Sequence, residues 1–162
     1  MFSSTILDEA KIVIEECQTA GLRLATAESC TGGLVSGALT AVPGASAVFE
    51  RGFVTYANAA KNAMLGVAPA LIAAHGAVSE PVSRAMAEGA LKRADVDLAV
   101  AVTGIAGPGG GSADKPVGLV HMAAARRGRE TVHERHVYSG DRADIRRQSV
   151  ADALRLLRRQ VD

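Results

Sequence analysis

The amino-acid sequence predicts an α/β fold with a mixed β-sheet, and three observations lead to that prediction. The chain has 162 residues, a length that suits a single domain over residues 1–162. Apolar residues make up 48% and aromatic residues only 3%, so Ala, Val, Leu and Ile would build the core. Helical and strand patterns alternate at first, and two consecutive strands then close the sheet, which is typical of layered α/β domains.

The first half of the chain alternates helices and strands. Ser4 can cap a first helix, whose apolar residues recur at helical spacing and which Gly21 ends. A short apolar strand follows at 22–27, and a helix of small residues runs from 33 to 42. The next expected elements are a strand at 50–57, a helix at 58–65 that Asn58 can cap, and a helix at 69–76.

The second half ends in a hairpin and a long helix. A helix is expected at 79–94, with Ser79 as N-cap and Pro81 in its first turn, the favoured place for proline. A buried strand is expected at 97–104, before a glycine-rich loop. The remaining elements are strands at 117–125 and 131–138, joined as a hairpin, and a helix from about 141 to 160.

The charge pattern points to no particular partner. The net charge is +1, although residues 126–162 carry ten Arg against six acidic residues. We interpret this basic tail as a solvated helix face, with anion binding by a few of its arginines as the alternative. The low aromatic content argues against a base-stacking surface, so no nucleic-acid partner is expected.

Cysteine usage and hydropathy indicate the compartment. Cys17 and Cys30 form no CxxC pair, so neither a zinc site nor a thioredoxin-type motif is indicated. The N-terminus carries no signal-peptide pattern, and no apolar run approaches the roughly 20 residues that cross a bilayer. We therefore expect a cytoplasmic protein with reduced thiols and no membrane contact.

The stretch TAESCTGG places two candidate nucleophiles, Ser29 and Cys30, in the turn between a strand and a helix. Such a turn lies at the ligand-facing edge of an α/β sheet, where free N–H groups can hold an oxyanion or a phosphate. Gly32 and Gly33 would let a ligand approach the backbone closely. The alternative is that Ser29 or Thr31 only caps the helix.

A serine nucleophile needs a base, and Lys61 in the stretch TYANAAKNAML is one candidate. A lysine can act as a base if burial or nearby positive charge lowers its pKa, and Tyr56 could relay a proton or orient the amine. The alternative is that Lys61 is a surface residue of its helix. His133 and His136 would face opposite sides of a strand, so they do not form a metal-binding pair.

The loop TGIAGPGGGSADKP follows a buried strand and reaches the same sheet edge as Ser29. Five of the eight residues from 104 to 111 are Gly, but the pattern is neither a Walker P-loop nor G-x-G-x-x-G. The loop would either offer a second set of backbone N–H donors to a substrate or be a flexible turn without function.

Two arginines, Arg142 and Arg146, share one face at the start of the last helix. Their guanidinium groups could clamp a phosphate. Alternatively, Asp141 and Asp144 pair with them in ordinary surface salt bridges.

Several stretches together resemble the CinA C-terminal domain family, in the family's order and over roughly residues 10–158. The stretches are AESCTGGLVSGALTAVPGAS, GFVTYANAAKNAMLGV, HGAVSE, AVTGIAGPGGG, KPVGLV and SGDRADIR. The family's activity is that of a nicotinamide-nucleotide amidase, which converts nicotinamide mononucleotide (NMN) and water to nicotinate mononucleotide and ammonia. The chain resembles the stand-alone form, without the N-terminal domain that some members carry.

The resemblance implies a three-layer α/β/α sandwich and a serine amidohydrolase that uses neither metal nor cofactor. It points to Ser29 as nucleophile and to Lys61 and Tyr56 as its activating partners. Cys30 is also part of the family pattern, so the resemblance does not exclude the thiol. The implied substrate-binding positions are Cys30, Thr31, Gly32, Gly33, Thr103, Gly104, Gly107, Arg142 and Arg146.

The expected mechanism is attack of Ser29 on the nicotinamide carboxamide, with N–H groups between Thr31 and Gly33 holding the oxyanion. The loop 103–111 and Arg142 or Arg146 would hold the phosphate, with a neighbouring subunit of a homo-oligomer as one source of these arginines. A catalytically silent interaction protein of the same fold is the alternative, although such a protein should have lost Ser29 or Lys61. A nucleic-acid module is a third reading, supported only by the basic tail.

Overall fold

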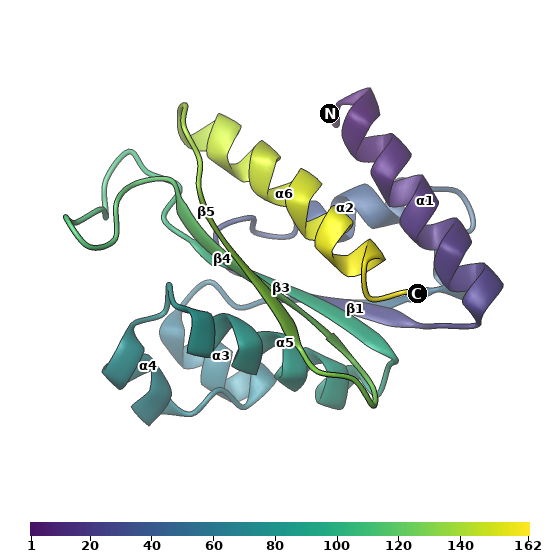
Figure 1. The fold of residues 1–162 in the computed structure, drawn as a ribbon, viewed down its shortest axis with the longest axis horizontal. Coiled ribbons are helices and arrows are strands. Elements are labelled where there is room, and N and C mark those ends of the chain that lie inside the picture. The colour runs from purple at the N-terminus through teal and green to yellow at the C-terminus, as the bar shows by residue number, and fades with distance from the viewer.

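Five strands form one mixed sheet in the computed structural model, which describes all 162 residues (Figure 1). The sheet order is β2-β1-β3-β4-β5, in which β1 pairs in parallel with β2 and β3. The pairs β3–β4 and β4–β5 are antiparallel. The strands are β1 (Leu24–Glu28), β2 (Phe49–Val54), β3 (Leu98–Gly104), β4 (Leu119–Arg126) and β5 (Val132–Val137).

Helices cover both faces of the sheet, so the expected three-layer sandwich is confirmed (Figure 1). One face carries α1 (Ser4–Ala20), α2 (Leu34–Thr40) and α6 (Arg142–Arg158). The other carries α3 (Asn58–Leu65), α4 (Pro69–His75) and α5 (Glu80–Ala94). The predicted elements are all present, with ends shifted by a few residues, and a 3₁₀ turn at Ala45–Ala47 was not predicted. None of the helices is long and apolar enough to cross a bilayer.

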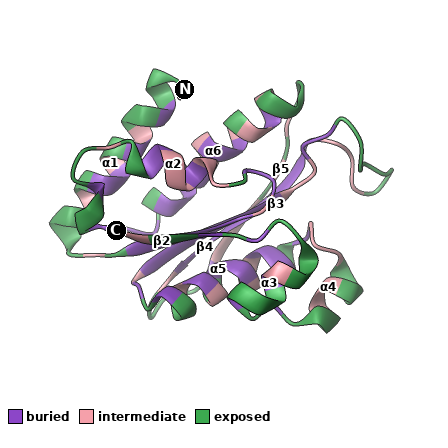
Figure 2. Cartoon of the chain, turned by 180° about the vertical axis from the view of Figure 1, so that it is seen from behind, coloured by how far each residue is buried: buried purple, intermediate pink, exposed green.

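The two faces of the sheet carry side chains of different size. In β3, Leu98, Val100 and Val102 belong to the core under α1, α2 and α6. The intervening Ala99 and Ala101 belong to the core under α5. Because side chains alternate across a strand, this pattern places the large side chains of β3 on one face of the sheet and its alanines on the other. Both faces are buried (Figure 2).

Two of the three predicted helix caps are wrong. The first helix is capped by Ser3, whose hydroxyl accepts from the Ile6 N–H, and not by Ser4. Asn58 is already helical, and Ala57 holds the N-cap position of α3. Ser79 does hold the N-cap position of α5, but its hydroxyl donates to the Gly76 carbonyl instead of capping.

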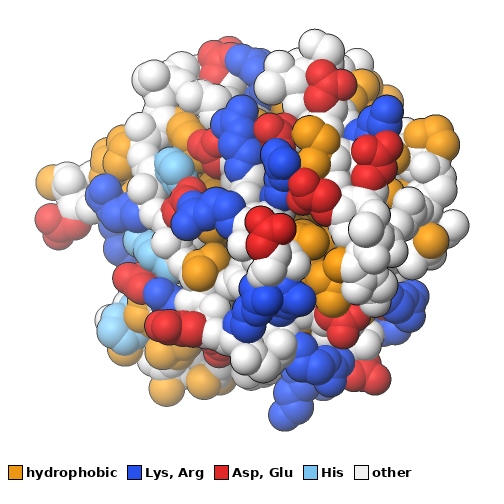
Figure 3. All heavy atoms as spheres, turned by 45° about the vertical axis from the view of Figure 1, so that its right-hand side comes forward, with side chains coloured by type: hydrophobic (Ala, Val, Ile, Leu, Met, Phe, Trp, Pro, Cys, Tyr) orange, Lys and Arg blue, Asp and Glu red, His pale blue; other side chains and the backbone are white.

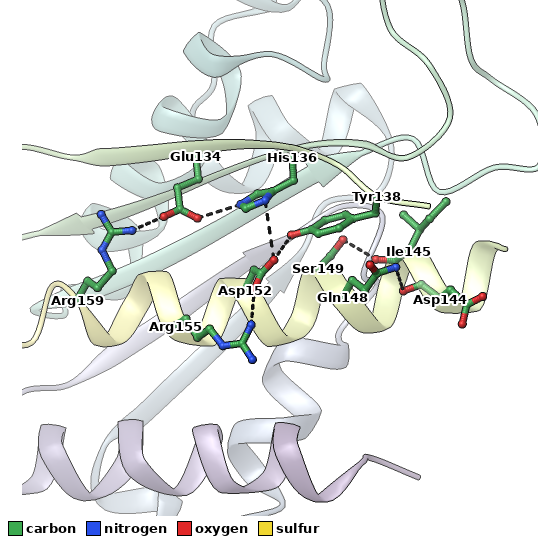
Figure 4. Close-up of polar contacts among 10 residues, drawn as sticks. All are labelled: Glu134, His136, Tyr138, Asp144, Ile145, Gln148, Ser149, Asp152, Arg155 and Arg159. Carbon is green, nitrogen blue, oxygen red and sulfur yellow. Dashed lines mark hydrogen bonds and ion pairs between the residues drawn. The ribbon is translucent and has the colours of Figure 1, made fainter. Parts of the chain in front are cut away.

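The basic tail forms ion pairs with acidic residues. In Figure 4, Asp152 of α6 accepts a hydrogen bond from the Tyr138 hydroxyl at 2.6 Å and pairs with Arg155 at 2.7 Å. Arg158 and Arg159 pair with Glu16 and Glu134, respectively. Basic and acidic side chains also intermingle on the face shown in Figure 3. These contacts fit the interpretation of the tail as a solvated, ion-paired helix face.

Candidate active site

Ser29 and Lys61 meet at the carboxyl end of β1. Ser29 directly follows the strand, and its N–H donates to the Val102 carbonyl of β3 at 2.9 Å. Lys61 belongs to α3 and is only 1% exposed. Its Nζ lies 3.1 Å from Ser29 Oγ. Lys61 is therefore no surface residue, and the structure brings together the two residues that the sequence singled out.

Burial of the Lys61 amine disfavours its charged form. Burial lowers the pKa of Lys61 below the ordinary value of 10.5. Besides Ser29 Oγ, Nζ contacts the carbonyl oxygens of Thr55 at 2.9 Å and Tyr56 at 3.4 Å. A neutral amine has two hydrogens and one lone pair. In the neutral form, the two hydrogens can bond to the two carbonyls while the lone pair accepts from the Ser29 hydroxyl.

A buried carboxylate fixes the helix that follows the turn. Glu28 is 1% exposed and accepts from the N–H groups of Val35 and Ser36 at 2.8 and 3.0 Å, and from the Ser36 hydroxyl at 2.9 Å. These N–H groups lie in the first turn of α2, where a negative charge is stabilised. Glu28, rather than Ser29 or Thr31, thus supplies the side-chain acceptor for this helix start.

Glu28 is the site residue that the sequence reasoning missed. An acid that ends an apolar strand must find donors when it is buried. The nearest donors along the chain are the free N–H groups at the start of the next helix, so that rule could have found the contact.

The turn itself keeps several backbone donors free. The N–H groups of Cys30, Thr31 and Gly33 donate to no acceptor within the chain, whereas Gly32 N–H donates to the Ser29 carbonyl. Gly32 and Gly33 have φ values of 57° and 101°, which other residues rarely adopt. The glycines therefore permit a tight turn that leaves unpaired donors beside Ser29.

Two arginines of α6 reach this turn and the glycine-rich loop. Arg146 donates to the carbonyls of Cys30 and Thr31 at 3.0 and 3.2 Å. Arg142 donates to the Gly107 carbonyl at 2.9 Å and to the Tyr56 hydroxyl at 2.8 Å. The phenol of Tyr56 thus contacts Arg142, and only the Tyr56 carbonyl contacts Lys61.

The alternative that these arginines form surface salt bridges with neighbouring acids is wrong. Asp141 and Asp144 form a capping box at the start of α6. Asp144 pairs with Arg147 instead. The guanidinium groups of Arg142 and Arg146 are therefore free of carboxylate partners.

Cys30 directly follows Ser29 and belongs to the hydrophobic core. Its side chain is 5% exposed, and burial raises the pKa of its thiol to about 11. A Cβ added at Gly104 would lie 3.1 Å from Cys30 Sγ and 2.7 Å from Val120, so glycine makes room for this packing. A thiol with a raised pKa holds little thiolate at neutral pH, which makes Cys30 a poor nucleophile.

The remaining predicted residues lie at the end of β3 and in the loop after it. Thr103 follows Val102 at the end of β3 and is fully buried, and its hydroxyl donates to the Ala77 carbonyl at 2.9 Å. Gly107 presents its carbonyl to Arg142. A cavity of about 640 Å³ lies between this loop and the start of α6, with Arg142 and Arg146 in its wall. Ser29 is not among its lining residues, so the cavity does not enclose the turn at Ser29.

No group of three or more His, Cys, Asp or Glu side chains in the structure is arranged so that it could hold a metal ion. His133 and His136 do face opposite sides of β5: His133 contacts His121 at 2.8 Å, and His136 contacts Glu134 at 2.9 Å near α6.

The fold and the site together define an α/β domain in which a half-buried serine and a buried lysine meet at the carboxyl ends of the parallel strands. A family model described as the CinA C-terminal domain matches residues 7–161. The chain belongs to the CinA C-terminal domain family.

Relatives and solved structures of this family cover nearly the whole chain. Nicotinamide-nucleotide amidohydrolase PncC from Escherichia coli is 49% identical over 99% of this chain and 97% of that protein. A CinA-like protein from Anaeromyxobacter dehalogenans is 52% identical over 98% of this chain, which spans only 40% of that protein. The crystal structure of the competence/damage inducible protein CihA from Agrobacterium tumefaciens matches with a TM-score of 0.95 and 50% identity, covering 97% of this chain and 96% of that one.

Proposed function

We propose that this chain is an amidohydrolase that converts NMN and water to nicotinate mononucleotide and ammonia, with Ser29 as nucleophile and Lys61 as base. The observation that carries the proposal is the buried Lys61 amine, 3.1 Å from Ser29 Oγ, with its pKa lowered by burial. The name of the Escherichia coli relative, which matches over 97% of its own length, supports the choice of substrate.

The acylation step uses the pair as nucleophile and base. Neutral Lys61 takes the proton of the Ser29 hydroxyl while Oγ forms a bond to the carboxamide carbon. The free N–H groups of Cys30, Thr31 and Gly33 are the candidate donors for the oxyanion. Lys61 then returns its proton to the leaving nitrogen, the C–N bond breaks and ammonia departs. The product of this step is an ester between the carboxyl group of nicotinate mononucleotide and Ser29 Oγ.

The deacylation step repeats the proton transfers with water. Lys61, again neutral, takes a proton from a water molecule that attacks the ester carbon. The bond from that carbon to Ser29 Oγ breaks, Lys61 returns the proton to Oγ, and nicotinate mononucleotide leaves. Both steps depend on an amine that is buried but within reach of Oγ, which is the arrangement found here.

The phosphate would lie against Arg142 and the loop after β3. Arg142 has no carboxylate partner and stands in the wall of the 640 Å³ cavity. A guanidinium group suits a phosphate because its N–H groups form paired, charge-assisted hydrogen bonds. The same cavity wall contains Arg146, but that side chain already donates hydrogen bonds to the carbonyls of Cys30 and Thr31, in the turn after Ser29.

The test is to incubate the purified chain with NMN and to measure both products, ammonia and nicotinate mononucleotide. We expect equal amounts of the two, in the presence of a metal chelator as well as in its absence. Nicotinamide riboside and free nicotinamide serve as comparison substrates for the contribution of the phosphate. A folded chain that releases no ammonia from NMN at neutral or alkaline pH would contradict the proposal.

A further inference from the structure

Arg146 has a bonding pattern unlike that of a ligand-binding arginine. Its Nε donates to the Cys30 carbonyl at 3.0 Å, and its Nη2 donates to the Thr31 carbonyl at 3.2 Å. Arg146 is the only hydrogen-bond donor of the Cys30 carbonyl. The rigid, planar guanidinium group of Arg146 thus binds the carbonyls of the two residues that directly follow Ser29.

These two contacts fix the orientation of the peptide groups in the turn. In a trans peptide the carbonyl and the following N–H point in opposite directions. The Cys30 carbonyl points to Arg146, so the Thr31 N–H must point away from Arg146. That N–H has no acceptor within the chain. Without Arg146 the Cys30 carbonyl would lose its partner, and the peptide between Cys30 and Thr31 could rotate.

Apart from Arg146, backbone hydrogen bonds hold the turn at its ends: Ser29 N–H donates to the Val102 carbonyl, and Leu34 N–H donates to the Thr31 carbonyl. Glu28 binds the N–H groups of Val35 and Ser36, which fixes the start of α2. Gly32 and Gly33 have positive φ values and no side chains to restrain them. None of these contacts reaches the Cys30 carbonyl, so the peptide between Cys30 and Thr31 depends on Arg146 for its orientation.

We propose that Arg146 is a positioning residue, which holds the carbonyls of Cys30 and Thr31 so that the Thr31 N–H faces the forming oxyanion, and that it does not bind the substrate phosphate. This inference rests on the proposed amidohydrolase function. It assigns different roles to the two arginines of α6: Arg142 faces the substrate, and Arg146 holds the turn after Ser29 in place.

The first test is the steady-state kinetics of Arg146→Met with NMN. The substitution keeps the length of the side chain but removes its donors. We expect kcat to fall by about tenfold or more, because a misplaced oxyanion donor stabilises the transition state poorly, while KM changes by less than about threefold. Arg147→Met is the matched control, since Arg147 is exposed and contacts Asp144 on the same helix, and it should leave both constants unchanged.

The variant Arg146→Lys distinguishes positioning from phosphate binding even if Arg146→Met fails to fold. A lysine retains the charge and binds phosphate well, but a single ammonium group cannot reproduce the fork across two carbonyls. Positioning predicts a lowered kcat for this variant. A variant that raises KM with kcat intact, or one that leaves both constants unchanged, would overturn the inference.

A readout independent of catalysis separates this inference from the proposed function. The N–H of Gly32 donates to the Ser29 carbonyl and that of Leu34 to the Thr31 carbonyl, so hydrogen exchange of these amides reports on the turn. We expect both to exchange at least about tenfold faster in Arg146→Met than in the wild type or in Arg147→Met. A wild type without ammonia release refutes the proposed function alone, whereas unchanged exchange at both amides refutes the role of Arg146.

Discussion

The guanidinium group of Arg142 donates a hydrogen bond of 2.8 Å to the hydroxyl of Tyr56, which lies 86 residues earlier in the chain. Arg142 also donates to the Gly107 carbonyl. One side chain of α6 therefore joins the segment after β2 to the loop after β3, on either side of the Ser29 turn. The phenol of Tyr56 is turned outward to Arg142 and is not aimed at the Lys61 amine.

We expect Tyr56→Phe to raise the KM for NMN by about twofold to fivefold and to change kcat little. The loss of the hydroxyl frees Arg142 to move but leaves the main-chain carbonyl that contacts Lys61 in place. Steady-state kinetics of the purified variant would check this. If the phenol instead relays a proton to Lys61, kcat would fall by tenfold or more, in the range typical of a lost general acid–base group.

Much of the fold could be predicted from the sequence because the responsible patterns are local. The alternation of large residues with alanine in β3 indicates which face of the sheet each residue occupies. Gly21 ends α1 in a left-handed conformation, which glycine adopts readily. Helix caps were predicted less well, since neighbouring serines such as Ser3 and Ser4 offer the same hydroxyl group.

The candidate site could be predicted only in part. The strand–turn–helix pattern predicts that Ser29 lies at the sheet edge, but the partners of its turn come from distant segments. Arg146 contacts Cys30 across 116 positions in the chain. A shared helical face for Arg142 and Arg146 does not reveal that one bonds to carbonyls of the turn and the other to Tyr56. The expected self-association of the chain stays a prediction.

We predict that Glu28→Ala destabilises the fold by roughly 2–4 kcal/mol, because the buried N–H groups of Val35 and Ser36 lose their acceptor. Denaturant unfolding followed by circular dichroism would measure the change in the free energy of unfolding. The control is Glu15→Ala on the exposed side of α1, which should change it by less than about 0.5 kcal/mol. Equal effects of the two substitutions would show that Glu28 does not anchor α2.

The pH dependence of kcat/KM should show an acidic limb that belongs to Lys61. The base must be neutral, so activity should decline as the pH falls through the pKa of Lys61. Because burial lowers that pKa, the midpoint should lie below the ordinary lysine value of 10.5. Initial rates with NMN over neutral to alkaline pH would locate it. A midpoint at or above the ordinary value would contradict the role of Lys61 as base.

A second pH effect should appear in the stability of the fold. His121 of β4 is buried and lies 2.8 Å from His133, and burial followed by the charge of His133 lowers its pKa from 6.5 to about 4. As the pH falls, His121 therefore binds a proton in the unfolded chain before it does so in the folded chain. The free energy of unfolding should be retained above about pH 6.5 and should decrease toward pH 4. We expect a loss of roughly 2–3 kcal/mol over that range.

The control for this pH effect is His121→Gln, which removes the titrating group but retains a hydrogen-bonding side chain beside His133. The free energy of unfolding of this variant should depend less on pH between 4 and 6.5 than that of the wild type. If the two pH profiles are parallel over this range, His121 is not the source of the effect.

The most direct measurement of the central claim compares ammonia release from NMN by the wild type, Ser29→Ala, Lys61→Ala and Cys30→Ala. We predict that Ser29→Ala and Lys61→Ala lower kcat by about a thousandfold or more, while Cys30→Ala keeps most of the activity. Thermal unfolding of each variant would confirm that it is folded. An inactive Cys30→Ala together with an active Ser29→Ala would contradict the account and make the buried thiol the nucleophile.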